Sequence, residues 1–335
     1  MKILVTGGAG YVGGTVAGLL TERGHEAVIF DNFFHSRREM LPTGIPWIEG
    51  DVANRPLLEN IFEQAAAAGR PFDGVMHFAA LIEAGESMKK PEIYFRNNTA
   101  STLSLLEAML AQRVRKLVFS STAAVYGEPE VVPIPEDARL APTNPYGESK
   151  LLAEYLLRWF HQIHGLHYAS LRYFNVAGAP ETSQGIVRGE AHEPESHLIP
   201  LIFDVVLGRR ECIHIYGDDY STPDGTCIRD YIHVSDLTDA HLLAFTALDS
   251  ANSTGRLIYN LGNGQGFSVN EVIESARRVT GHTIPTRLCP RRHGDPAVLV
   301  ASSEKAIREL GWKPRYAQLD EILRTAWVWH QKRYA

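Results

Sequence analysis

The stretch Lys2-Ile-Leu-Val-Thr-Gly-Gly-Ala-Gly-Tyr-Val-Gly13 joins a short apolar run to three glycines at regular spacing. The apolar run predicts a buried strand, and apolar residues then recur at helical spacing as far as Gly24. This order of strand, glycine turn and helix is typical of a dinucleotide-binding loop, whose glycines let the backbone approach a pyrophosphate at a helix N-terminus. The alternative is a plain strand-to-helix turn.

An acidic residue stands where such a loop needs one. A second apolar run, residues 27–30, ends in Asp31, about 20 residues after the last glycine. A carboxylate there accepts adenosine ribose hydroxyls and repels a 2′-phosphate, which favours NAD over NADP. Arg37 and Arg38, close by in the sequence, weaken that preference.

The alternation of strands and helices continues along the chain. Strand-like segments at 47–49, 74–78 and 116–119 are separated by helical segments at 55–68 and 91–112. The pattern predicts an α/β fold: a Rossmann-type doubly wound parallel sheet, with a smaller, interleaved C-terminal α/β substrate lobe. We expect residues 1–176 to form the first domain, with 230–250 returning to it, and 177–335 to form mainly the lobe. The lobe should contain a long loop over 178–200 and helices at 198–207, 269–279 and 319–329.

Ligands of such sheets bind beyond the carboxyl ends of the strands. That rule selects the residues that follow the predicted strands: Asp51, Val52, Phe78, Ala79, Ala80, Ser120 and Thr122. Asp51 has an alternative role as a helix cap, and the two alanines as packing residues.

A tyrosine and a lysine lie four residues apart in Asn144-Pro-Tyr-Gly-Glu-Ser-Lys150. The Asn-Pro start and the apolar residues that follow predict a helix, which places Tyr146 and Lys150 on one face. An ammonium about 5 Å away should lower the phenol pKa by about 2.5 units, which is nearly enough for a base at neutral pH, and a second positive charge nearby would complete the shift. The Thr122 hydroxyl could pass a proton between this phenol and a substrate. The alternatives are an exposed pair that merely shares a helix, and a threonine that bonds its own turn.

Composition excludes several classes of protein. With 335 residues, 44% hydrophobic and 21% charged, and a net charge of -6, the chain has no general attraction to nucleic acid or anionic membranes. No apolar run approaches the roughly 20 residues of a membrane span. Three scattered cysteines indicate neither a disulfide framework nor a zinc site, and the His161, His164 and His167 run is broken by Gly165. We expect a cytoplasmic protein without a metal.

Several motifs together carry a family resemblance. The glycine loop, Ser120-Ser-Thr122, Tyr146-x-x-x-Lys150 and Arg172-Tyr-Phe-Asn-Val-Ala-Gly178 resemble the extended short-chain dehydrogenases that act on nucleotide sugars. The second half is similar to the UDP-glucose 4-epimerase family in motifs that come in the family's order. These are Tyr216-Gly-Asp-Asp-Tyr220, Asp224-Gly-Thr226, Arg229-Asp-Tyr-Ile-His-Val234, Tyr259-Asn-Leu-Gly262 and Arg291-Arg-His-Gly-Asp295.

The resemblance implies an isomerase that keeps NAD bound and interconverts UDP-glucose and UDP-galactose. A hydride leaves C4 of the hexose while Tyr146 takes the proton of its hydroxyl, and the 4-keto sugar turns over and receives the hydride on its other face. The resemblance also implies a homodimer built on two helices, whose apolar residues are Leu103, Leu106, Met109, Leu110, Leu152, Tyr155, Leu156 and Trp159.

The resemblance also assigns individual residues. Thr122, Tyr146 and Lys150 would be catalytic. NAD would contact Gly7, Gly10, Tyr11, Val12, Gly13, Asp31, Asn32, Asp51, Val52, Phe78, Ala79, Ala80, Asn97, Ser120, Tyr146, Lys150 and Phe174. The UDP-sugar would contact Thr122, Asn175, His197, Leu198, His214, Tyr216, Arg229, Arg292, Asp295 and Leu299. Arginines suit a diphosphate because they offer forked donors, although both could instead make surface salt bridges.

Three positions depart from the family pattern. Ile82 stands where many epimerases have a lysine near the cofactor, and His197 where Asn is common. Leu299 stands where a bulky Tyr or a small Cys gates the sugar's C2 group, which leaves N-acetylated sugars possible substrates.

Three alternatives to this function remain. The first is another UDP-sugar 4-epimerase, acting on N-acetylated or pentose sugars. The second is a nucleotide-sugar dehydratase, which would need an acidic pair where Ala123-Ala124 follows Thr122. The third is a non-catalytic NAD-sensing protein on the same fold.

Overall fold

The computed structural model describes residues 1–335 except 183–184, 187, 251–252, 293 and 335. The chain forms two units. The first comprises residues Met1–Gly127, Arg139–Arg172 and Thr238–Tyr259, and the second Glu128–Ala138, Tyr173–Leu237 and Asn260–Ala335. The second unit thus includes residues 128–138, which the sequence analysis placed in the first.

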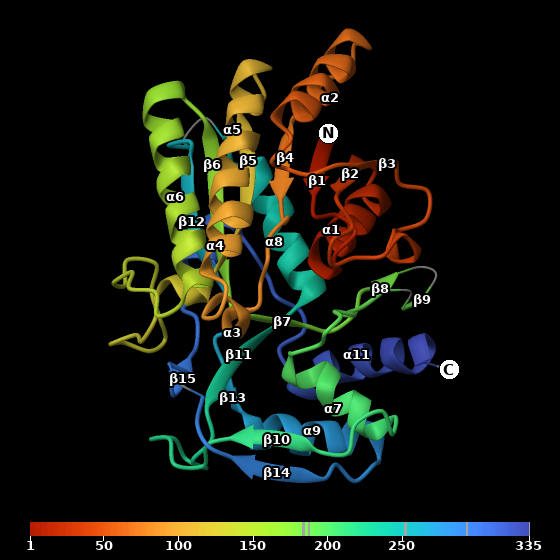
Figure 1. The fold of residues 1–335 in the computed structure, drawn as a ribbon, viewed down its shortest axis with the longest axis vertical. Helices are drawn as coiled ribbons and strands as arrows, with labels where there is room; N and C mark the ends of the chain where they lie inside the picture. Colours follow the sequence, from red (N-terminus) through yellow and green to blue (C-terminus); the bar gives the residue numbers. More distant parts are fainter. Residues whose placement is uncertain (183–184, 187, 251–252, 293, 335) are drawn as a thin grey trace. The chain divides into compact units, whose positions relative to one another are not determined.

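The first unit is built on a seven-stranded sheet of order β12-β6-β5-β4-β1-β2-β3 (Figure 1). The pairings of β1 with β2 and β4, of β2 with β3 and of β4 with β5 are parallel, which confirms the predicted doubly wound sheet. The order reverses between β1 and β4, where sheets of this kind open a ligand crevice. The strands are β1 (Lys2–Thr6), β2 (Glu26–Asp31), β3 (Trp47–Glu49), β4 (Gly74–His77), β5 (Lys116–Thr122), β6 (His167–Tyr173) and β12 (Arg256–Leu261).

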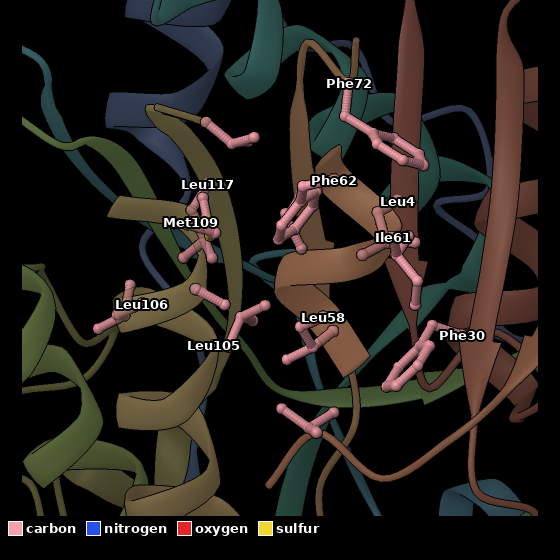
Figure 2. Close-up of a cluster of buried hydrophobic side chains, with 14 of the residues drawn as sticks. Leu4, Phe30, Leu58, Ile61, Phe62, Phe72, Leu105, Leu106, Met109 and Leu117 are labelled. Carbon is pink, nitrogen blue, oxygen red and sulfur yellow. The ribbon is translucent and has the colours of Figure 1, made fainter. Parts of the chain in front are cut away.

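Helices cover both faces of this sheet. Side chains alternate along a strand, so Leu4 of β1 joins the core under α2 (Arg55–Ala67) and α5 (Ser101–Ala111), as Figure 2 shows. On the opposite face, a Cβ at Gly74 would lie 2.8 Å from the Phe245 ring of α8 (Val234–Ala247). The remaining long helices of this unit are α1 (Tyr11–Glu22) and α6 (Pro145–His164).

The predicted helix over 91–112 is interrupted. It consists of α4 (Pro91–Tyr94), a π-helical turn η2 (Phe95–Ala100) and α5, and a short α3 (Ala84–Ser87) precedes it. Asn98 in η2 accepts a hydrogen bond from Leu81 N at 2.8 Å and donates to Leu81 O at 3.0 Å, so its side chain pairs with neighbouring backbone. Such turns often occur at functional sites, and apolar periodicity does not reveal them.

The second unit has smaller sheets and its own core. Strand β11 (Ile228–His233) pairs with β7 (Asn175–Ala177), β13 (Gly266–Ser268) and β15 (Val298–Leu299). Two further pairs are β10 (Ile213–Tyr216) with β14 (Thr286–Cys289), and β8 (Glu181–Thr182) with β9 (Gly185–Ile186). Ile202, Phe203, Ile273 and Ile322 are buried between α7, α9 and α11.

Three helices of this unit match predicted ones: α7 (Leu198–Val206), α9 (Val269–Thr280) and α11 (Leu319–Tyr334), which extends beyond the predicted end at residue 329. A further helix, α10 (Glu304–Leu310), was not predicted. The sequence marks the start and the end of α9, because Ser268 and Glu271 form a capping box and Gly281 follows with a φ of +71°. The predicted loop over 178–200 contains β8 and β9, and its residues 183–184 and 187 lie outside the described part. None of the described helices is long and apolar enough to cross a membrane.

Candidate active site

The glycine loop passes close to the end of β4. Gly7 has a φ of +70°, and a Cβ there would lie 2.5 Å from Ala79 N. A Cβ on Gly13 would lie 2.4 Å from Gly7 O, so the first turn of α1 also needs a bare backbone. Gly10 is the N-cap of α1, and no side chain caps this helix end. Tyr11 and Val12 form its first turn.

Asp31 ties this loop to the end of β2. Its carboxylate accepts hydrogen bonds from Ala9 N at 2.9 Å, Phe33 N at 2.8 Å and Ser36 Oγ at 2.9 Å. A carboxylate has about four acceptor positions, so one remains for a ligand hydroxyl.

Asp51 does not cap a helix. The N-cap of α2 is Asn54, which accepts from Leu57 N, so the helix-cap alternative for Asp51 is wrong. Asp51 instead accepts from Ala53 N at 2.8 Å and from Asn32 Nδ2 at 2.9 Å. The Val52 side chain lies in the core, which leaves its backbone for any ligand contact.

Close packing at the start of α6 places Tyr146. A Cβ on Gly147 would lie 2.6 Å from Ala124 O, so the helix starts directly against the turn η3 (Ala123–Val125). Tyr146 is hydrogen-bonded to Thr122, the last residue of β5. Thr122 Oγ1 also accepts from Ala124 N at 3.1 Å, so the local-turn alternative and the contact with the phenol both hold.

The electrostatic expectation for Tyr146 and Lys150 is wrong for the protein chain alone. Burial raises the pKa of Tyr146, and the hydrogen bond to Thr122 offsets only part of that rise. Burial also lowers the pKa of Lys150 to about 7, because an ammonium is poorly solvated there. Lys150 Nζ donates to Ser120 O at 2.8 Å, so the lysine is anchored to β5. Helical spacing alone could not predict these burial effects.

A buried ion pair lies close to the predicted catalytic residues, and it was not predicted from the sequence. Glu154 of α6 accepts from Arg172 Nε at 3.0 Å, from Arg172 Nη2 at 2.6 Å and from Ser121 Oγ at 2.6 Å. Arg172 also donates to Tyr126 Oη at 2.9 Å. The pair joins α6, β5 and β6 next to Thr122 and Lys150. In the sequence, the signal for this buried pair was the presence of polar residues within otherwise apolar segments.

The π-helical turn connects the end of β4 with α6. Asn98 Nδ2 donates to Ser149 Oγ at 3.0 Å, directly before Lys150. Asn97, the predicted cofactor residue, donates to Asn98 Oδ1 at 3.0 Å. Asn98 was not among the predicted site residues, although it orients the segment that carries Lys150.

Four predicted substrate residues come together in the second unit. Arg229 of β11 pairs with Asp295, which also accepts from Arg292 Nη2 at 2.8 Å. Arg292 lies over the Tyr216 ring at 5.0 Å. The salt bridges proposed as an alternative do form, but within the predicted site. Leu299 pairs with Arg229 in the β11–β15 register.

The other predicted residues of this unit are placed separately. Asn175 starts β7 opposite Tyr231 of β11, and the His214 and Tyr216 rings of β10 meet edge to face. Leu198 packs against the core of the unit and Phe174 is buried, which leaves both with little exposed surface for a ligand.

His197 has partners that its predicted role did not anticipate. Its Nδ1 lies 3.0 Å from Glu190 Oε1 and 3.1 Å from Glu195 Oε1. These carboxylates raise its pKa well above the usual value, against the effect of burial. Nδ1 of His197 therefore interacts with these two carboxylates of the protein.

The geometry of the first unit agrees with a family comparison. Residues 3–262 match the model of the NAD dependent epimerase/dehydratase family. The chain belongs to this family. The chain is 52% identical to the UDP-glucose 4-epimerase of Streptomyces lividans, over 98% of this chain and 96% of that protein. The resemblance seen in the sequence motifs is confirmed.

Solved structures agree with this assignment. The chain superposes on a Brucella ovis UDP-glucose 4-epimerase in complex with NAD with a TM-score of 0.91 and 42% identity, covering 98% and 97% of the two chains. The Bifidobacterium longum enzyme in complex with NAD+ and UDP gives a TM-score of 0.89 and 38% identity, covering 99% and 98%.

Proposed function

We propose that this protein is a UDP-glucose 4-epimerase that interconverts UDP-glucose and UDP-galactose. The observation that carries the proposal is the 52% identity to a UDP-glucose 4-epimerase over 98% of the chain. The contact of Tyr146 with Thr122 at the carboxyl end of β5 supports it, because ligands of doubly wound sheets bind at that edge.

The first unit fits NAD. Gly7 and Gly13 let the loop pack directly against the backbone where a Cβ would collide, and this close packing holds the loop at the N-terminus of α1, whose N-cap is Gly10. Asp31 keeps one acceptor position for a ribose hydroxyl. When bound there, NAD supplies a reversible hydride acceptor for C4 of the sugar.

The chain's own residues move the proton. Tyr146 takes the proton of the C4 hydroxyl and later returns it, and the Thr122 hydroxyl can relay it. Because burial raises the pKa of Tyr146, the phenol needs positive charge nearby to act as a base at neutral pH. The ammonium form of Lys150, held by Ser120 O, is the chain's own source of that charge.

The second unit offers groups for the nucleotide. We assign Arg229 and Arg292 to the diphosphate, since both present forked donors, and Asp295 to the uridine ribose. Both arginines would exchange part of their pairing with Asp295 for the ligand. Asn175, Tyr216 and the other predicted residues stay part of this proposal, and Leu299 is assigned to the sugar.

The proposal includes a cytoplasmic homodimer. Trp159 and Tyr155 of α6 are 56% and 39% exposed, which supports an interface on this helix. Leu106 and Met109 are fully buried in the unit's core, so their expected place in such an interface is wrong. Cys212, Cys227 and Cys289 are free thiols, as a reducing compartment would maintain.

The test is conversion of UDP-galactose by the purified protein without added NAD, with products resolved by chromatography. UDP-glucose should form, and Tyr146→Phe should lower kcat by about 10²–10⁴-fold. A parallel reaction with UDP-N-acetylgalactosamine tests whether Leu299 admits the larger C2 group. If UDP-galactose is unchanged even after NAD is supplied, the proposed function is wrong.

A further inference from the structure

A cluster of four titratable side chains precedes α7. The segment Glu190-Ala-His-Glu-Pro-Glu-Ser-His197 repeats the pattern Glu-x-His. One ligand atom from each of Glu190, His192, Glu195 and His197 lies within 4.8 Å of the others. The proposed epimerase chemistry uses none of these groups except His197, whose Nδ1 faces into the cluster rather than toward a sugar.

The spacing of these atoms suits a tetrahedral metal ion. Zinc bonds to nitrogen and oxygen of about 2.0–2.2 Å place the ligand atoms of a tetrahedron about 3.3–3.5 Å apart. His197 Nδ1 lies 3.0 and 3.1 Å from the two carboxylates, and His192 Nδ1 lies 3.3 Å from Glu190 and 3.7 Å from Glu195. Small shifts of these atoms would make room for an ion at their centre.

His192 distinguishes a metal site from a network of hydrogen bonds. Its Nδ1 is buried and makes no hydrogen bond in the described part of the chain, although two carboxylates lie near it. A hydrogen-bonded ion pair would align the imidazole N–H with one oxygen, because buried polar groups are normally satisfied. His192 Nδ1 lies at ion-pair distance from both carboxylates without a well-aligned hydrogen bond to either, so it is available as a metal ligand.

Other groups hold these side chains in position. Glu195 Oε1 accepts from the backbone N–H groups of Ser196 and His197, both at 2.9 Å. The Trp329 indole of α11 donates to Glu190 O at 3.0 Å. Bonds of this kind orient the ligands of metal sites and are part of their affinity.

We propose that Glu190, His192, Glu195 and His197 bind one Zn²⁺ ion. Two carboxylates and two imidazoles, each of which releases its second ring proton when the metal binds, form a set of nitrogen and oxygen ligands that balances the charge of a divalent ion, and imidazole selects zinc over magnesium or calcium. Four protein ligands leave no open position, so the site is structural. It ties residues 190–197 to the start of α7. From the sequence we expected no metal, because the three cysteines are scattered and Gly165 breaks the run of histidines in 161–167.

Metal content tests the proposal independently of epimerase activity. The full-length protein, incubated with zinc and then dialysed, should retain about one zinc ion per chain by mass spectrometry, and chelation should lower its Tm. Replacement by Co²⁺ should give the intense visible absorption of tetrahedral cobalt. A wild-type protein that retains no zinc, or a weak octahedral cobalt spectrum, would overturn the proposal.

Variants locate the site. His192→Ala should lose the zinc and the chelator-dependent change in Tm, whereas His164→Ala, at an exposed histidine of α6, should keep both. Glu195→Gln is the milder variant if His192→Ala does not fold, and it should bind zinc at least about 10-fold more weakly. Zinc retained at full stoichiometry by a folded His192→Ala or by Glu195→Gln would place the metal elsewhere.

Discussion

Glu154→Gln should strongly destabilise the first unit. In the wild type, Arg172 and Glu154 are 3% and 6% exposed, and the carboxylate accepts two hydrogen bonds from the guanidinium and one from Ser121. Glutamine keeps the volume but removes the charge, and it turns an amide NH₂ toward guanidinium donors. Arg172 stays ionised because its pKa is raised far above neutrality, so its charge would remain buried without a counter-charge. Breaking a buried pair in this way costs about 3–5 kcal/mol.

Urea unfolding followed by circular dichroism measures this loss as a lower midpoint at constant slope. The matched control is Glu59→Gln on α2, which removes a partly exposed pair with Arg55 and should cost about 0.5 kcal/mol or less. We also expect a lower kcat, because Ser121 and Thr122 are adjacent on β5. A loss for Glu154→Gln within about 1 kcal/mol of the control would refute the reasoning, since the pair would then contribute no more than a surface contact.

Three further changes test other parts of the structure. Gly7→Ala should abolish NAD retention in the purified protein, because its Cβ would lie 2.5 Å from Ala79 N. The control is Gly24→Ala, at a glycine that also has a positive φ but lies in open space; this variant should keep NAD and lose only about 1–2 kcal/mol of unfolding free energy. Burial lowers the pKa of Lys150 to about 7, so between about pH 7 and 9.5 the unfolded state binds the extra proton and stability rises with pH. Lys150→Met should therefore be more stable than the wild type near pH 7, and this difference in unfolding free energy should be about 3 kcal/mol smaller at pH 9.5. If the stabilities of the variant and the wild type depend on pH in the same way, the burial effect is contradicted. Trp159→Glu should convert the dimer to a monomer, as measured by light scattering, whereas Ile307→Glu, at a residue 48% exposed, should leave the dimer intact. An unchanged mass for Trp159→Glu would exclude this face of α6 as the interface.

Local patterns were sufficient to predict the elements around the glycine loop. The apolar run before Gly7, the glycine spacing and Asp31 at the end of β2 predicted the strand, the turn and the acid as the structure has them. These features depend on neighbours in the sequence, because glycine conformations, caps and apolar periodicity act over a few residues. The capping box at Ser268 is another example, since both of its hydrogen bonds form within one helical turn.

Long-range partners were not predictable in this way. Nothing near Glu154 indicated that Arg172 would neutralise it, and nothing near Asn98 indicated that Leu81 and Ser149 would bind its amide. The pairing was set by how α6, β5 and β6 come together, which a single sequence does not encode in any local spacing.

The sequence by itself determined the order of the main strands and helices of the first unit, the edge of the sheet where the candidate site is expected and the family to which the chain belongs. Only the tertiary structure decided the charges there, because desolvation depends on atoms from distant segments. Tyr146 and Lys150 were correctly placed on one helix face, yet burial moved their pKa values in directions that a spacing of four residues did not predict. Likewise, the sequence shows the repeat of Glu190 to His197, but only the folded loop turns its four side chains toward one point.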